Sequence, residues 1–116
     1  MRHRHKGKTL DRQAQARNLM LRNLAASLIL YEKIKTTEAR AKAVKSIVDH
    51  VIMIGRAGDL NARRQLLKIL PVKNAVAKVI EDLGPRYKKR TGGCSRIIKL
   101  LPRQGDAAKM VHIELV

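Results

Sequence analysis

The chain of 116 residues is poor in aromatic side chains, because it contains two tyrosines and neither phenylalanine nor tryptophan. Hydrophobic residues nevertheless make up 45% of the sequence, which is too many for a disordered chain. The core must therefore be aliphatic. A chain of this length suits one domain that buries roughly two-thirds of the surface of its unfolded form. We expect a single domain over residues 10–116.

Cysteine is limited to Cys94, which excludes an intrachain disulfide and favours a reducing compartment. The sequence begins with a polar, basic segment where a signal peptide would have an apolar core. No uninterrupted apolar run approaches the length of a membrane span. We therefore expect a cytoplasmic protein that does not bind membranes.

Acidic side chains are also few. Nine Asp and Glu oppose 26 Lys and Arg, so the formal net charge is +17. A compact domain with this charge repels itself and concentrates polyanions around it. Cationic side chains that neutralise phosphates release condensed counterions, so nucleic acid is the favoured partner. The alternative is a soluble basic protein without a polyanionic ligand.

Patterns for catalysis, metal binding and nucleotide binding are missing. Glu81 and Asp82 are neighbours on a predicted helix and point in different directions, which disfavours paired acid–base chemistry. His3 and His5 have no nearby Cys or carboxylate that would complete a metal site. The glycines at 92–93 lack the spacing of a phosphate-binding loop. We expect no enzymatic activity, no cofactor, no metal and no small-molecule substrate.

Residues 1–9 form a basic segment without an acidic side chain and, after Met1, without a large apolar one. Such a segment cannot contribute to a core, and we interpret it as an extended arm that becomes ordered against a partner. Arginine suits this role because it can bridge phosphate oxygens with two donors. The arm is predicted to bind nucleic acid through Arg2, His3, Arg4, His5, Lys6 and Lys8.

Apolar residues at helical spacing predict two long helices in the first half of the chain. The first covers about 10–31 and has a basic side. Its inward stripe consists of Leu21, Leu24, Ala25 and Leu28. The second runs to about Ile54, where Gly55 and Gly58 are expected to end it. Thr37 is its expected N-cap, and Glu38 in the first turn complements the helix dipole.

Two shorter helices are predicted next. Asp59 is the expected cap of the third helix and Pro71 its stop. The residues expected to pack inward from it are Leu60, Leu66, Leu67 and Leu70. The fourth helix is expected to stop at Gly84-Pro85. Its inward residues are predicted to be Val72, Val76, Val79, Ile80 and Leu83.

Three segments have the pattern of strands: 33–37, 95–101 and 109–116. The last two are separated by a turn region around Gly105-Asp106. Val111, Ile113 and Leu115 would share one face of the last strand, as in a sheet with one face on a helical layer. The predicted fold class is α+β, with about four helices packed on a small, mainly antiparallel sheet and an extended basic N-terminal arm.

The scarcity of aromatics also restricts the mode of nucleic-acid binding. Single-strand binders usually stack bases on aromatic rings, and only Tyr31 and Tyr87 are available here. Phosphate and sugar contacts to folded RNA should therefore dominate, with shape supplying the specificity. A further contact is expected at the basic segment 86–90, because the glycines at 92–93 let the backbone come close to a ligand.

Short motifs spread over the whole chain carry a family resemblance. They are Met1-Arg2-His3-Arg4, Arg22-Asn23, Ile34-Lys35-Thr36-Thr37, Ala41-Lys42, Leu83-Gly84-Pro85-Arg86, Gly92-Gly93, Arg96-Ile97, Gly105-Asp106 and Ile113-Glu114-Leu115. In this combination the sequence resembles the family of bacterial large-subunit ribosomal protein seventeen. One departure is Cys94, where that family usually has Tyr, so an aromatic contact expected there is missing.

The resemblance implies an architectural protein of the large ribosomal subunit with a role in translation and subunit assembly. Its implied partners are large-subunit ribosomal RNA and neighbouring ribosomal proteins near the nascent-chain exit. The arm residues would enter the RNA. The further RNA-binding residues that the resemblance implies are Arg12, Arg17, Arg22, Lys35, Thr36, Thr37, Arg86, Arg90 and Arg96.

Two other classes stay open from the residues alone. The charge would also suit a nucleoid-type DNA-binding protein, although such proteins usually show a groove-reading helix or a dimer-forming element. A basic amphipathic helix could also act at anionic membranes. Affinity for folded ribosomal RNA against duplex DNA at matched salt, and a lipid-vesicle pull-down, separate these classes.

Overall fold

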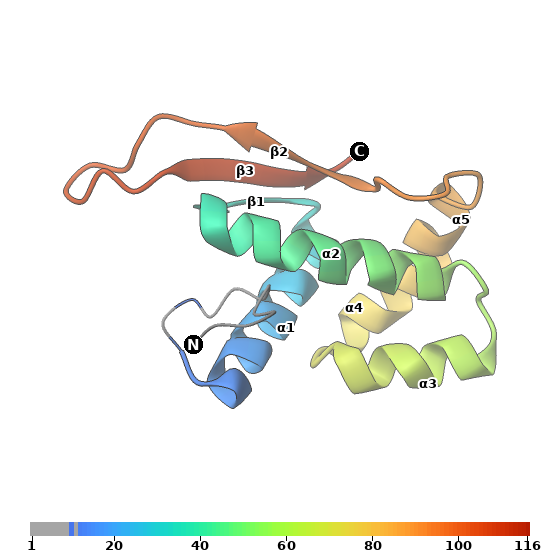
Figure 1. The fold of residues 1–116 in the computed structure, drawn as a ribbon. Coiled ribbons are helices and arrows are strands. Elements are labelled where there is room, and N and C mark those ends of the chain that lie inside the picture. Colours follow the sequence, from blue (N-terminus) through green and yellow to red (C-terminus); the bar gives the residue numbers. More distant parts are fainter. Residues whose placement is uncertain (1–9, 11) are drawn as a thin grey trace, which may run out of the picture.

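The computed structural model describes residues 10 and 12–116, so the predicted arm at 1–9 lies outside the described residues. Its helices lie beside a three-stranded antiparallel sheet (Figure 1), which confirms the predicted α+β fold. In chain order the elements are α1 (Ala14–Tyr31), β1 (Lys33–Thr37), α2 (Glu38–Gly55), α3 (Leu60–Ile69), α4 (Lys73–Lys78), η1 (Val79–Leu83), α5 (Gly84–Arg86), β2 (Ser95–Lys99) and β3 (Met110–Leu115).

The last strand in the sequence, β3, lies in the centre of the sheet, in the order β1-β3-β2. Ile113 faces Ile34 of β1 on one side and Ile97 of β2 on the other. Val111 and Ile113 are fully buried under the helices, as the alternating pattern predicts. The first strand has the predicted bounds, whereas β2 and β3 are each shorter than predicted. Helix α2 packs along the sheet and contacts all three strands (Figure 1).

Helix α1 begins at Ala14, later than the predicted start near residue 10, and Gln13 at its N-cap makes no capping bond with its side chain. The helix ends after Tyr31 because Glu32 has a φ of 62° and donates its N–H to the Leu28 carbonyl at 2.7 Å. This left-handed residue turns the chain directly into β1. The predicted inward stripe of α1 is buried, apart from Leu24, which is half-buried.

The predicted start of α2 is confirmed, with Thr37 in the N-cap position and Glu38 in the first turn. The Thr37 side chain makes no capping bond, and the Glu38 N–H bonds to the Lys109 carbonyl at 2.9 Å instead. Helix α2 ends at Gly55, as predicted, and Gly55 is a buried residue of its last turn. Gly58, with a φ of 67°, lies in the turn that follows.

Helix α3 confirms the Asp59 cap, whose carboxylate accepts the Ala62 N–H at 2.8 Å. The prediction that Leu60 and Leu67 pack inward is wrong, because they are 62% and 48% exposed. These two leucines are seven positions apart and so share one side of the helix. The helix packs instead through the narrow stripe that contains Leu66, which leaves that other side in solvent.

The fourth helical segment departs from the prediction at both ends. Val72 is an exposed N-cap residue rather than an inward one, since α4 begins only at Lys73. Gly84-Pro85 does not end the helix, because a wide turn, η1, carries it on into α5. In η1 the Gly84 N–H bonds to the Val79 carbonyl five residues back. The wider π-type turn leaves room for a proline ring that would clash in an α-helix.

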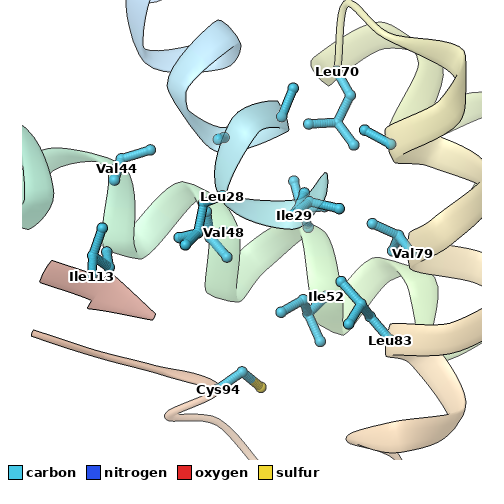
Figure 2. Close-up of a cluster of buried hydrophobic side chains, with 14 of the residues drawn as sticks. Leu28, Ile29, Val44, Val48, Ile52, Leu70, Val79, Leu83, Cys94 and Ile113 are labelled. Atoms are coloured by element: carbon cyan, nitrogen blue, oxygen red, sulfur yellow. The ribbon is translucent and has the colours of Figure 1, made fainter. Parts of the chain in front are cut away.

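The core is aliphatic, as predicted, and gathers side chains of the helices and β3 around Leu28, Ile52 and Ile113 (Figure 2). Tyr87 is only 2% exposed, and its hydroxyl donates to the Val116 carbonyl at 2.6 Å. The prediction that Tyr87 is available for stacking is therefore wrong. Tyr31 is the exposed aromatic ring, at 74%. Over residues 10 and 12–116, no helix combines the length and apolarity needed to span a membrane.

Candidate nucleic-acid interface

The cations of the described residues lie at the surface of every major element. Four of the 26 Lys and Arg and one of the nine acids lie outside the described residues, which leaves 22 cations and eight carboxylates. None of these 22 cations is buried. Seven of them have a described carboxylate within 4.0 Å. The other 15 have none among the described residues and are the cations best placed to meet an external anion.

Three arginines in or just before α1 were predicted to bind RNA, and they do not lie in one row along the helix. Arg12 precedes the helix and is exposed, Arg17 is half-buried, and Arg22 is exposed. Arg17 and Arg22 are five positions apart, so they lie on different sides of the helix. Arg22 lines a hollow between α1, α2 and the end of α3, together with His50 of α2. The arginines can therefore contact more than one segment of a ligand.

Three consecutive residues of β1 that were predicted to bind RNA point in different directions. Lys35 is exposed on the face of the sheet away from α2, opposite His112 of β3. Thr36 is 7% exposed and points toward the helical layer. Thr37 is half-buried and lines a hollow at the first turn of α2 with Lys42 and Lys109. The structure thus brings Lys35 and Thr37, but not the Thr36 side chain, to a surface.

Arg86 is engaged within the protein. Its guanidinium donates to Glu32 and, at 2.8 Å, to Asp82, and it lies 5.9 Å from the centre of the Tyr87 ring. The hydrogen bond from Arg86 is the main cause that lowers the pKa of the Glu32 carboxyl. Lys78 reaches the same carboxylate at 3.6 Å. These contacts join the end of α1 to α4 and α5, so Arg86 has a structural role.

The loop after α5 presents an exposed run of three cations, Lys88, Lys89 and Arg90. Arg56 at the end of α2 donates to the Lys88 carbonyl at 2.8 Å and anchors the loop. Arg90 donates to the Gly93 carbonyl at 3.1 Å across the glycine pair. Two hydrogen bonds therefore hold the basic loop that the sequence predicts, and Arg90 stays exposed on it.

Arg96 of β2 lies on the face of the sheet away from α2 and donates through Nε to Glu114 at 2.7 Å. Lys33 of β1 approaches the other oxygen of Glu114 at 4.0 Å. This pairing, chiefly the bond from Arg96, lowers the pKa of the Glu114 carboxyl. One carboxylate thus sits between two cations, and this side of the sheet keeps a net positive charge.

Sequence reasoning missed cations that the fold brings together. Lys99 and Lys109 lie at the two ends of the connection between β2 and β3, and both are exposed. They line adjoining hollows that share Glu38. The available signal was the strand pattern on either side of the turn, because antiparallel pairing of those strands brings the two lysines to the same end of the sheet.

A family model described as "Ribosomal protein L17" matches residues 20–116. The chain belongs to the ribosomal protein L17 family. This confirms the resemblance that the motifs carry.

Relatives match the chain over nearly all of its length. It is 48% identical over 116 residues to large ribosomal subunit protein bL17 of Rubrobacter xylanophilus, covering 100% of this chain and 96% of the relative. It is 50% identical over 107 residues to bL17 of Caldanaerobacter subterraneus subsp. tengcongensis, covering 92% and 96%. With bL17 of Syntrophotalea carbinolica the identity is 48% over 116 residues, covering 100% and 75%.

Cys94, the single cysteine of the chain, is a core residue. Its side chain is 1% exposed and lies near Ile52 and Leu83 (Figure 2). Burial is the main cause that raises the pKa of the thiol, which favours its neutral form. Position 94 therefore contributes packing in this chain. Among the described residues, no group of three His, Cys, Asp or Glu side chains could hold a metal ion.

Proposed function

We propose that the chain is a structural constituent of the large ribosomal subunit that binds its ribosomal RNA through phosphate and sugar contacts. Membership of the L17 family supports a ribosomal role, and the relatives' printed names supply the subunit. The observation that carries the RNA contact is that five of the residues predicted to bind RNA are surface cations with no described carboxylate within 4.0 Å: Arg12, Arg17, Arg22, Lys35 and Arg90. Such cations release counterions when they meet phosphates.

The contacts we propose follow from the placement of each residue. Arg12, Arg17, Arg22, Lys35 and Arg90 meet RNA phosphates, because none has an ion-pair partner among the described residues. The arm residues Arg2, His3, Arg4, His5, Lys6 and Lys8 join them on the grounds of sequence.

Three further residues of the predicted site have narrower roles. Arg96 uses only Nε in its short bond to Glu114 and keeps its terminal nitrogens for a phosphate. Arg86 positions the basic loop rather than contacting RNA, since both of its terminal nitrogens bond to carboxylates. Thr36 holds β1 in place while its neighbours Lys35 and Thr37 face the ligand.

The family favours RNA over duplex DNA, and folded RNA is favoured over single strands because Tyr31 is the one exposed tyrosine ring among the described residues on which a base could stack. The cations lie on several elements, which suits a protein packed between several RNA segments. Neighbouring ribosomal proteins near the nascent-chain exit are proposed as partners on the family resemblance alone. We therefore infer that the chain works in cytoplasmic ribosomes, where it has a role in translation and subunit assembly and no catalytic role.

Sedimentation tests the assignment to the subunit. A tagged copy should travel with the large subunit on a sucrose gradient and stay there through a high-salt wash. Recovery at the top of the gradient, or together with DNA, would contradict the proposal.

RNA titrations at several salt concentrations test the contacts. Deletion of residues 2–8 should weaken binding to large-subunit RNA and reduce the salt slope by about 0.7 to 0.9 log units per lost phosphate contact. The triple variant Arg12→Gln/Arg17→Gln/Arg22→Gln should reduce the slope more than the matched variant Arg63→Gln/Arg64→Gln/Lys68→Gln on α3. Equal effects of the two triple variants would mean that total charge, not the proposed site, sets the affinity.

A further inference from the structure

The connection between β2 and β3, residues 100–109, forms a hairpin loop that reaches past the first turn of α2 (Figure 1). Its tip is held by its own bonds rather than by the core. The Arg103 guanidinium donates to both oxygens of Asp106, at 3.0 and 2.6 Å. Backbone bonds join Arg103 N–H to the Ala108 carbonyl at 2.9 Å and Ala107 N–H to the Arg103 carbonyl at 3.0 Å.

The backbone conformation of this tip is fixed by local contacts. Asp106 also accepts the Ala108 N–H at 3.2 Å, and Ala107 adopts a φ of 54° that residues with a side chain rarely take. A tip built in this way presents a fixed surface to a partner, at little entropic cost on binding.

Residues 100–108 of the hairpin carry no net charge. Arg103 and Asp106 are its charged residues between positions 100 and 108, and they neutralise each other. Leu101, two positions past the end of β2, is 87% exposed, more than any other large apolar side chain among the described residues. Such a side chain gains free energy when a partner covers it.

The base of the hairpin is strongly cationic. Lys99 and Lys109 stand at its two ends, and Lys42 on the first turns of α2 lies beside them. Glu38 is the carboxylate among them, and it pairs with Lys42 at 2.9 Å. Lys109 and Lys99 both contribute to the lowered pKa of Glu38, after the larger effect of Lys42. Three lysines around one carboxylate repel each other, and a polyanion would relieve that repulsion.

We propose that this hairpin is a second RNA-binding arm, in which Lys99 and Lys109 hold phosphates while Leu101 packs against riboses in the minor groove of an RNA helix. The inference rests on the proposed function. It adds the hairpin, which the sequence did not indicate, to the RNA-binding surface. The wide, shallow minor groove of A-form RNA leaves its riboses and base edges accessible, so it admits an exposed side chain such as that of Leu101. The lysines make the RNA a better match than an apolar pocket of a protein.

The proposal predicts two separable effects on binding of the full chain to large-subunit RNA. Leu101→Ser should weaken binding about tenfold without changing the salt slope, since burial of a leucine is worth roughly one to two factors of ten. Lys99→Gln/Lys109→Gln should instead reduce the salt slope by about 1.4 to 1.8 log units. Leu60→Ser is the matched control, because Leu60 is also exposed but lies on α3.

A hairpin variant keeps the test independent of any one side chain. Replacing residues 101–109 with Asn-Gly joins Leu100 directly to Met110 through a two-residue turn, removes Leu101 and Lys109, and preserves the paired part of β2 and β3. Hydroxyl-radical footprinting should show ribose protections that the intact chain gives and this variant loses. Unchanged affinity and protections in both the Leu101→Ser and the shortened variants would overturn the inference while the proposed function stands.

Two other outcomes are informative. If the intact chain itself fails to bind large-subunit RNA, the proposed function fails, and the hairpin inference fails with it. If Leu101→Ser binds naked RNA normally but is lost from assembled subunits, the tip contacts a protein, and the RNA assignment is wrong.

Discussion

The backbones of Gly55 and Gly84 touch where the last turn of α2 meets α5. A Cβ placed on Gly84 would lie 2.5 Å from the Gly55 carbonyl oxygen, and a Cβ on Gly55 would lie 2.3 Å from Cγ1 of Val79. Both residues are helical, and Gly84 has a φ of −54°, so their small size rather than their backbone freedom is what the position needs. This contact seats the wide turn η1 against α2.

Gly84→Ala should therefore lower the free energy of unfolding by about 2 kcal/mol, because the new methyl group meets backbone atoms that cannot move aside. The better helix propensity of alanine, about 1 kcal/mol, offsets only part of the clash. Urea denaturation measures the change. Gly92→Ala is the control, since nothing lies within 4 Å of a Cβ there, and it should stay within about 0.5 kcal/mol of the parent. A stable Gly84→Ala variant would show that the two helices separate easily.

Leu28→Ala should cost about 2 to 5 kcal/mol of stability, because Leu28 is fully buried in the centre of the core and its loss leaves a cavity. Leu19→Ala on the same helix is a matched substitution, and its effect should stay within about 0.5 kcal/mol because Leu19 is 57% exposed. Thermal and urea unfolding of the two variants give the comparison. Similar losses at the two positions would contradict the orientation of α1.

Cys94 should react slowly with a thiol reagent such as Ellman's reagent in the folded protein, since burial blocks access and raises the pKa of the thiol. One equivalent should react promptly in denaturant. Prompt reaction under native conditions would mean that the strand start at 94–95 opens readily.

The hairpin tip should keep its ion pair to unusually low pH. Hydrogen bonding from Arg103 lowers the pKa of the Asp106 carboxyl to about 2. Because the folded-state pKa is depressed, the stabilisation of the tip is fully present above the ordinary value near 3.8 and is lost as the pH falls through about 2. The amide shift of Ala108 in NMR spectra reports this titration. In Arg103→Gln the midpoint should move up, and an equal midpoint in both proteins would contradict the pairing.

Local signals in the sequence predicted the fold class well. The Asp59 cap, the strand at 33–37 and the alternation of β3 depend on neighbouring residues, so the sequence displays them directly. The continuation of the helix through Gly84-Pro85 depends on distant residues instead. It requires a widened preceding turn and close packing of Gly84 on Gly55, which the local sequence does not display. Likewise, Leu60 and Leu67 fit a helical stripe, yet the neighbouring elements cover only the other side of α3.

The candidate site was harder to predict, since the charge of a residue does not reveal its partner. Arg86 and Arg90 look alike in the sequence, but Glu32 is brought to Arg86 from 54 positions away. Thr36 was expected beside RNA from its place in a motif, although strand alternation turns it inward. Lys99 and Lys109 became neighbours only through antiparallel pairing.

The central place of β3 has a consequence for the order of folding during synthesis. Strands β1 and β2 do not pair with each other, so neither has a hydrogen-bonded neighbour until residues 110–115 have left the ribosome that makes them. The helical part, whose contacts between α1, α2 and α4 need only residues up to about 80, can form before that. The newly made chain can therefore pack its helices while the strand that unites its sheet is still missing.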